Sequence, residues 1–142
     1  MASLDDYLRH QAGQHQRDGI ATTHVLVDES APPRILGYCT LAAAQLELQA
    51  LQPADRKRLP RHPVPAVRVA RLAVAQDQHA RGYGRLLLGH AVNSGLMLRG
   101  QLGVKAIVVD ALDDRAASFY RAYGFRETAH AARTLYLSLG KS

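Results

Sequence analysis

The sequence has few of the features that mark secreted or membrane proteins. With Cys39 as the only cysteine, the chain cannot form an internal disulfide, which fits a reducing compartment. Every apolar run falls short of the roughly 18 residues that a membrane-spanning helix needs. The first residues are acidic and polar, unlike the basic and apolar regions of a signal peptide. These absences predict a cytoplasmic protein with no membrane segment.

The composition predicts a globular domain with one hydrophobic core. Of the 142 residues, 47% are apolar and 21% are charged, which are ordinary values for a folded domain of this length. We therefore expect residues 1–142 to form a single domain. Cys39 lies in the apolar segment 35–41, which favours a buried structural thiol over a nucleophile.

Basic residues exceed acidic ones by 18 to 12, giving a formal net charge of +6. Most of the basic residues are arginines, whose planar guanidinium binds phosphate oxygens in a bidentate manner. The excess favours an anionic partner, such as a nucleic acid or a phosphorylated cofactor. A GC-rich coding bias would produce the same composition, so both interpretations remain open.

Hydrophobic periodicity and turn residues predict an α+β sandwich with a mixed, mostly antiparallel sheet flanked by helices. Gly37, inside an apolar run, indicates a bulge or a close backbone approach. The expected helices span 3–19, 82–98 and 115–123, and the expected strands span 22–28, 35–46, 67–75, 106–109, 125–128 and 134–139. The apolar stripe expected on the second helix is Leu86, Leu87, His90, Ala91, Ser94, Met97 and Leu98.

Residues 47–65 interrupt this pattern. They hold four of the six prolines and the basic run Arg56, Lys57 and Arg58, which together predict an exposed, partly extended loop. Two interpretations are open for it. It is either a solvated connector or a basic flap that contacts an RNA backbone.

The segment 67–88 carries the strongest local signal. A strand leads into a turn with Gly82 and Gly84 and then into a helix, so several backbone N–H groups point the same way. These donors and the positive end of the helix dipole favour phosphate, and Arg81 and Arg85 would add charge-assisted hydrogen bonds. A simple tight turn would give the same pattern.

Three segments in a fixed order carry a family resemblance. They are ARLAV at 70–74, HARGYG at 79–84 and FYRAYGF at 119–125. Together they resemble the GNAT N-acetyltransferases, which bind acetyl-coenzyme A and transfer its acetyl group to an amine. Two motifs in the right order are much more specific than either one. The resemblance extends over about residues 4–140 and implies the GNAT fold.

Longer segments, among them ILGYCTLAAA and VVDALDDRAASFYRAYGF, are similar to the acetyltransferase toxins of bacterial toxin–antitoxin pairs. Members of that group acetylate the α-amino group of aminoacyl-tRNA and thereby block translation. The resemblance implies acetyl-coenzyme A as co-substrate, aminoacyl-tRNA as substrate, a ribbon-helix-helix antitoxin as partner, and a homodimer. Two alternatives remain: an enzyme that acetylates a small amine or a protein, and a non-catalytic module that only binds coenzyme A or the antitoxin.

The resemblance also assigns roles to residues. Tyr120 corresponds to the tyrosine of the family's FY motif and is expected to act as the general acid that protonates the departing thiolate. Without the resemblance, the neighbouring residues indicate only an aromatic residue of the core. The Val74 N–H is expected to polarise the thioester carbonyl. The residues expected to bind the cofactor are Leu72, Ala73 and Val74 at the pantetheine arm, His79, Ala80, Arg81, Gly82, Tyr83, Gly84 and Arg85 at the pyrophosphate, and Asp113 and Phe119. Asp113 is also expected to cap the third helix.

The histidines are expected to play no chemical part. Their spacing does not suit a metal, and the sequence shows no partner for any of them. Surface or packing roles are expected for His24, His62, His79, His90 and His130. No general base is predicted either, because an aminoacyl ester amine titrates near or below pH 8 and is partly neutral already.

The sequence departs from the family pattern in two places. His79 stands where relatives carry Gln or Arg at the start of the glycine motif. The chain also opens where relatives are already in their second helix. We therefore expect the first strand and the first helix to be absent, which would leave a sheet edge exposed.

Overall fold

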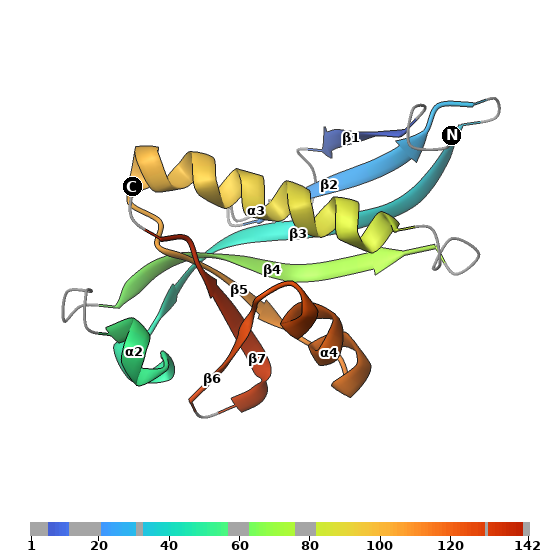
Figure 1. Cartoon of the computed structure of the whole chain (residues 1–142). Coiled ribbons are helices and arrows are strands. Elements are labelled where there is room, and N and C mark those ends of the chain that lie inside the picture. The colour runs from blue at the N-terminus through green and yellow to red at the C-terminus, as the bar shows by residue number, and fades with distance from the viewer. Residues whose placement is uncertain are drawn as a thin grey trace. The chain divides into compact units, whose positions relative to one another are not determined.

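The computed structural model describes residues 6–11, 21–30, 33–56, 63–75, 82–129 and 131–140 (Figure 1). Its seven described strands form one sheet in the order β1-β2-β3-β4-β5-β7-β6. The strands are β1 (Asp6–Gln11), β2 (Ala21–Asp28), β3 (Arg34–Leu46), β4 (Val64–Val74), β5 (Ala106–Asp110), β6 (Arg126–Thr128) and β7 (Ala131–Ser138). The helices are η2 (Leu48–Ala50), α2 (Pro53–Arg56), α3 (Tyr83–Leu102) and α4 (Asp114–Ala122). No described helix is long and apolar enough to cross a membrane.

The strand pairing confirms the predicted fold class. β1 with β2, β2 with β3, β5 with β7, and β6 with β7 all pair antiparallel. β4 and β5 are neighbours in the sheet and are connected through α3, the kind of crossover that parallel strands need. The result is a mixed, mostly antiparallel sheet with helices.

The chain divides into two compact units. The first unit contains residues 1–42 and 69–92, and the second contains residues 43–68 and 93–142. β3, β4 and α3 each contribute residues to both units.

In the first unit, the N-terminal segment differs from its prediction. A helix was expected over 3–19, but Asp6–Gln11 form β1, which pairs with β2 from Asp6 opposite Asp28 to Gln11 opposite Thr23. The β2 edge, which was expected to be left exposed, is therefore covered by β1. The backbone donors and acceptors at the β2 edge are paired by β1, and this tertiary pairing overrides the local helical pattern. The rest of the predicted helix lies outside the described residues.

Also in the first unit, the expectation for Gly37 is confirmed. Leu26 pairs with Gly37 and Val27 with Ile35, so one extra residue of β3 forms a bulge between them. A Cβ atom on Gly37 would lie 2.7 Å from the carbonyl oxygen of Ala73. Only glycine permits β3 to approach β4 so closely at this point.

In the second unit, residues 47–56 and 63–65 contain more regular secondary structure than predicted. η2, α2 and the start of β4 replace much of the expected loop, and Leu51 and Val64 are each only 1% exposed. Burial of these apolar side chains holds the segment in place. They belong to a core cluster that comprises Leu46, Leu51, Val64, Ala66, Ala106, Val108 and Tyr136. Residues 57–62, which carry most of the basic run, lie outside the described residues.

The buried face of α3 also differs from the predicted stripe. Leu86 and Met97 were expected to face the core but are 43% and 67% exposed. The buried positions are Tyr83, Leu87, Leu88, Ala91 and Gly95. A Cβ atom on Gly95 would lie 2.3 Å from Ile107 Cδ1. A close helix–strand contact that needs glycine therefore sets which face of α3 is buried, and apolarity alone did not reveal it.

Candidate active site

The glycine turn and the start of α3 lie in the first unit. Gly82 has φ +79°, a left-handed conformation that favours glycine, and among the described residues other than its chain neighbours no heavy atom lies within 4 Å of the position that a Cβ would occupy. The Leu86 N–H donates to the Gly82 carbonyl oxygen at 3.2 Å, so the helical hydrogen bonds begin at the turn itself. The first-turn N–H groups of a helix point out of its positive end. The open space beside Gly82 and the exposed Arg85 at this end suit an anion such as a pyrophosphate.

Of the expected pyrophosphate residues, four are described and three are not. Gly82, Tyr83, Gly84 and Arg85 form the turn and the first turn of α3. His79, Ala80 and Arg81 lie outside the described residues, so their expected roles stay predictions.

The expected pantetheine segment forms the last residues of β4. Leu72, Ala73 and Val74 are each half-buried. Just after them, the Ala75 N–H donates to the Leu36 carbonyl oxygen at 2.8 Å. Together with the close approach at Gly37, this hydrogen bond holds the end of β4 against β3.

Tyr120 lies in the second unit, on α4, and is 6% exposed. Its ring centroid lies 5.3 Å from that of Phe119 and 5.6 Å from that of Phe125, and Phe119 packs in turn against Tyr123 at 5.1 Å. These edge-on and tilted contacts are the favoured geometries for aromatic pairs. The ring of Tyr120 therefore has a packing role, as the local interpretation predicts, and this role is compatible with a chemical task for its hydroxyl group.

Asp113 is the N-cap of α4, as predicted. Its carboxylate accepts a hydrogen bond from the Ala116 N–H at 2.8 Å, and Asp114 occupies the first turn. At the other end, Gly124 has φ +93° and its N–H donates to the Arg121 carbonyl oxygen. Both ends of the helix that carries Tyr120 are thus defined by local hydrogen bonds.

These residues divide between the two units. The β4 end and the α3 turn belong to the first unit, whereas Asp113, Phe119 and Tyr120 belong to the second. The joint action of the two groups on one cofactor stays a prediction of the family resemblance.

One pair of histidines lies close together in the first unit. His24 Nδ1 and His90 Nε2 lie 2.6 Å apart, within hydrogen-bonding distance, and both rings are half-buried in the first unit. Both residues therefore have a partner that the sequence did not show. The two residues are 66 positions apart and are brought together by β2 and α3, so no local pattern could have revealed the pair. In the described part of the chain, no cluster of three potential ligands could hold a metal ion.

A second set of polar contacts, not anticipated from the sequence, lies in the second unit. The fully buried Tyr136 donates through its hydroxyl group to the Asp55 carboxylate and accepts from the Gln52 N–H at 2.9 Å. Burial and the bond to Asp55 raise the pKa of the Tyr136 phenol. Asp55 also forms an ion pair with Arg126 at 3.2 Å. α2 is thereby attached to β7 and β6.

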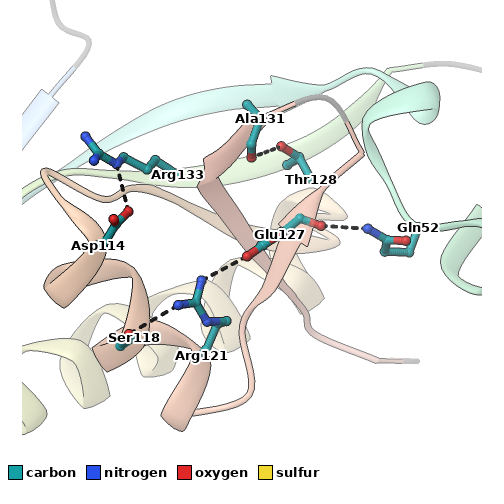
Figure 2. A network of polar contacts seen from close by, with 8 residues as sticks. All are labelled: Gln52, Asp114, Ser118, Arg121, Glu127, Thr128, Ala131 and Arg133. Carbon is teal, nitrogen blue, oxygen red and sulfur yellow. Dashed lines mark hydrogen bonds and ion pairs between the residues drawn. The ribbon is translucent and has the colours of Figure 1, made fainter.

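An open pocket of about 480 Å³ lies beside this network. Its wall includes Arg121 and Glu127, which form a 2.9 Å ion pair, while the Gln52 side-chain amide donates to the Glu127 carbonyl oxygen at 3.0 Å (Figure 2). The residues that line the pocket are Gln52, Pro53, Ala54, Arg121, Phe125, Arg126 and Glu127.

Comparison with known proteins places these features in a family. The acetyltransferase (GNAT) domain model matches residues 21–127, which run through both units. The tRNA-acetylating toxin of Mycobacterium tuberculosis (strain ATCC 25618 / H37Rv) is 32% identical over 123 residues, which cover 87% of this chain and 72% of that protein.

Two solved structures of the toxin AtaT share the fold. AtaT complexed with acetyl-methionyl-tRNAfMet has a TM-score of 0.84 at 22% identity, covering 94% of this chain and 95% of that chain. A tyrosine-to-phenylalanine mutant of AtaT, bound to the C-terminus of the antitoxin AtaR and acetyl-CoA, has a TM-score of 0.76 at 20% identity, covering 95% and 94%. The chain therefore belongs to the GNAT family of acetyl-coenzyme A-dependent N-acetyltransferases and is a homologue of the tRNA-acetylating toxins.

Proposed function

We propose that this chain transfers the acetyl group of acetyl-coenzyme A to the α-amino group of aminoacyl-tRNA and so blocks translation as a toxin. The observation that carries the proposal is the 32% identity with a tRNA-acetylating toxin along 87% of this chain. The formal net charge of +6 suits a nucleic-acid substrate.

The proposed reaction is a direct attack of the neutral amine nitrogen on the thioester carbonyl carbon. The new C–N bond forms, the C–S bond breaks, and coenzyme A leaves as a thiolate. The Tyr120 phenol gives its proton to that sulfur, and water takes the proton released by the amine. The Val74 N–H hydrogen bonds to the carbonyl oxygen, where negative charge develops in the transition state.

Main-chain groups bind much of the cofactor. The backbone of Leu72, Ala73 and Val74 holds the pantetheine arm, and the open turn at Gly82 leaves room for the pyrophosphate. The remaining pyrophosphate residues are His79, Ala80, Arg81, Tyr83, Gly84 and Arg85. Asp113 bonds to the pantetheine, and Phe119 also contacts the cofactor.

The organisation of the molecule is part of the proposal. Residues 1–142 act as a single cytoplasmic domain, a view supported by the family match that runs through both units. The active form is a homodimer, and a ribbon-helix-helix antitoxin neutralises it. These features follow from the resemblance to toxins of toxin–antitoxin pairs.

The decisive experiment incubates the protein with total charged tRNA and labelled acetyl-coenzyme A. We expect label on the aminoacyl end, and for Tyr120→Phe a fall in kcat of about 10²–10⁴-fold with unchanged binding of acetyl-coenzyme A by calorimetry. The matched control is Tyr123→Phe, which alters a 44%-exposed tyrosine of the same aromatic cluster and should retain activity. Transfer to polyamines or proteins but not to tRNA would favour the small-amine alternative. Binding of the cofactor without any transfer would favour the non-catalytic module.

A further inference from the structure

We propose that the pocket formed by α2, α4 and β6, here called the arginine pocket, binds the phosphodiester backbone of the tRNA. Its phosphate ligands are Arg121 and Arg126, which both line the pocket. This inference rests on the proposed function, because it takes the RNA to be the tRNA substrate.

Arg121 is held in a fixed orientation by two neighbours. Its Nη1 donates to Glu127 Oε2 at 2.9 Å and its Nη2 donates to Ser118 Oγ at 3.2 Å (Figure 2). A guanidinium carries five N–H donors, so these two contacts leave donors for a further anion. The Arg121 side chain is 43% exposed, which makes those donors accessible to a ligand.

Arg126 is held through a chain of contacts that ends in the core. Its Nη1 lies 3.2 Å from Asp55 Oδ2, and the same carboxylate accepts from the hydroxyl group of the fully buried Tyr136. Tyr136 in turn accepts from the Gln52 N–H at 2.9 Å. Asp55 is therefore held in place, and it orients one side of the Arg126 guanidinium. The Arg126 side chain is 56% exposed.

Arginines positioned in this way suit phosphate better than free surface arginines do. Fixing a flexible arginine side chain in one conformation costs conformational entropy. Because Glu127 and Asp55 already restrict these two arginines in the free protein, less entropy is lost when a ligand binds. The remaining donors can bind two phosphate oxygens at once.

The charge of the pocket region matches a phosphodiester. Two arginines and one acidic residue line the pocket, namely Arg121, Arg126 and Glu127, while Asp55 pairs with Arg126 from outside this lining. The lining thus has one positive charge in excess. A phosphodiester carries one negative charge per nucleotide, which complements this excess.

The test measures binding of fluorescently labelled, deacylated total tRNA to the full chain between 50 and 200 mM salt. For each of Arg121→Gln and Arg126→Gln we expect roughly five- to tenfold weaker binding near 0.1 M salt, and a salt dependence reduced by about one in log–log slope. In the acetylation assay, KM for charged tRNA should rise while KM for acetyl-coenzyme A stays unchanged. Wild-type binding that neither variant alters would overturn the inference.

Arg133→Gln is the matched control. Arg133 is 55% exposed and pairs with Asp114 at 3.3 Å (Figure 2). It thus resembles Arg126 in exposure and pairing, but it does not line the pocket. The Arg133→Gln substitution should weaken tRNA binding less than twofold. If Arg133→Gln weakens tRNA binding as much as Arg121→Gln and Arg126→Gln do, the inference is overturned, because the loss of net charge alone would then explain the effect.

Two further comparisons complete the test. Arg121→Lys and Arg126→Lys retain the charge but not the planar fork, so each should weaken binding less than the glutamine variant does. They also cover the case of a glutamine variant that folds poorly. Polyglutamate serves as a competitor that is anionic but is not a nucleic acid. If it displaces labelled tRNA from the wild type as well as unlabelled tRNA does, and if the variants bind polyglutamate as weakly as they bind tRNA, the site is not specific for RNA and the inference is contradicted.

The readout separates the two proposals. Deacylated tRNA cannot be acetylated, so its binding does not depend on the catalytic step. If charged tRNA is acetylated but the pocket variants bind normally, the function stands and the arginine pocket is refuted. If the pocket variants lose binding but no acetylation occurs, the pocket stands and the proposed reaction is refuted.

Discussion

Gly37 determines how closely β3 and β4 can approach beside the residues proposed to hold pantetheine. For Gly37→Ala, the added Cβ would lie 2.7 Å from a backbone oxygen of Ala73 and 3.0 Å from Leu87 Cδ1, so the strands must separate. We expect the free energy of unfolding to fall by about 1–3 kcal/mol, as is usual for an overpacked interior. Urea denaturation monitored by circular dichroism measures this change.

Gly89 is the matched control for that substitution. It lies within α3, and apart from the helix's own backbone no heavy atom of the described part of the chain lies within 4 Å of its Cβ position. For Gly89→Ala we expect unchanged stability or a gain of up to about 1 kcal/mol, because alanine favours the helix. Equal losses for the two variants would contradict the packing explanation for Gly37.

At the level of the element, α4 depends on its N-cap. For Asp113→Ala, the hydrogen bond to the Ala116 N–H is lost, and we expect a loss of about 1 kcal/mol in the free energy of unfolding. Because α4 carries Tyr120, kcat for acetyl transfer should fall as well. Asp113→Asn should retain both, since asparagine caps helices as well as aspartate does. Chemical denaturation and steady-state kinetics on the two variants separate a capping role from a need for the negative charge.

For the whole molecule, we expect stability to fall in alkaline solution. Burial raises the pKa of the Cys39 thiol to about 12, and the pKa of Tyr136 is raised as well. A group with a raised pKa in the folded state stabilises fully below its unfolded pKa, and the stabilisation is lost as the pH rises toward the folded value. Between pH 9 and pH 11 the free energy of unfolding should therefore drop by about 2 kcal/mol through the thiol alone.

Urea titrations at several pH values measure this drop, and Cys39→Ala provides the control. The thiol is 0% exposed, so the variant loses some packing energy at every pH. Its stability should nevertheless decline less steeply than that of the wild type from pH 9 to pH 11. If the stability of Cys39→Ala declines as steeply as that of the wild type, titratable groups other than the Cys39 thiol cause the loss of stability at alkaline pH.

Local chemistry explains which elements the sequence predicted correctly. The cap at Asp113, the stop at Gly124 and the apolar run that forms β5 depend on residues near each other in the chain, so their bounds were predicted to within a residue or two. The turn at Gly82 is also local, since its positive φ suits glycine alone among ordinary residues.

Long-range contacts explain where the prediction was wrong. The N-terminal segment has helical spacing, yet Asp6–Gln11 pair with β2, because an open strand edge offers more hydrogen bonds than an isolated helix turn can. The pairing of His24 with His90 and the arginine pocket both join residues more than 60 positions apart. Such contacts leave no periodic trace in the sequence.

The sequence by itself identified the family, because three short motifs occur in a fixed order. The resemblance to that family implies the cofactor segments and the role of Tyr120, which stay predictions. The tertiary structure alone decided that β1 covers the β2 edge, that α3 buries the face with Gly95, and that Arg126 is held by Asp55 and Tyr136. The physical reason is that packing and charge pairing depend on distances in space, which the order of residues along the chain does not specify.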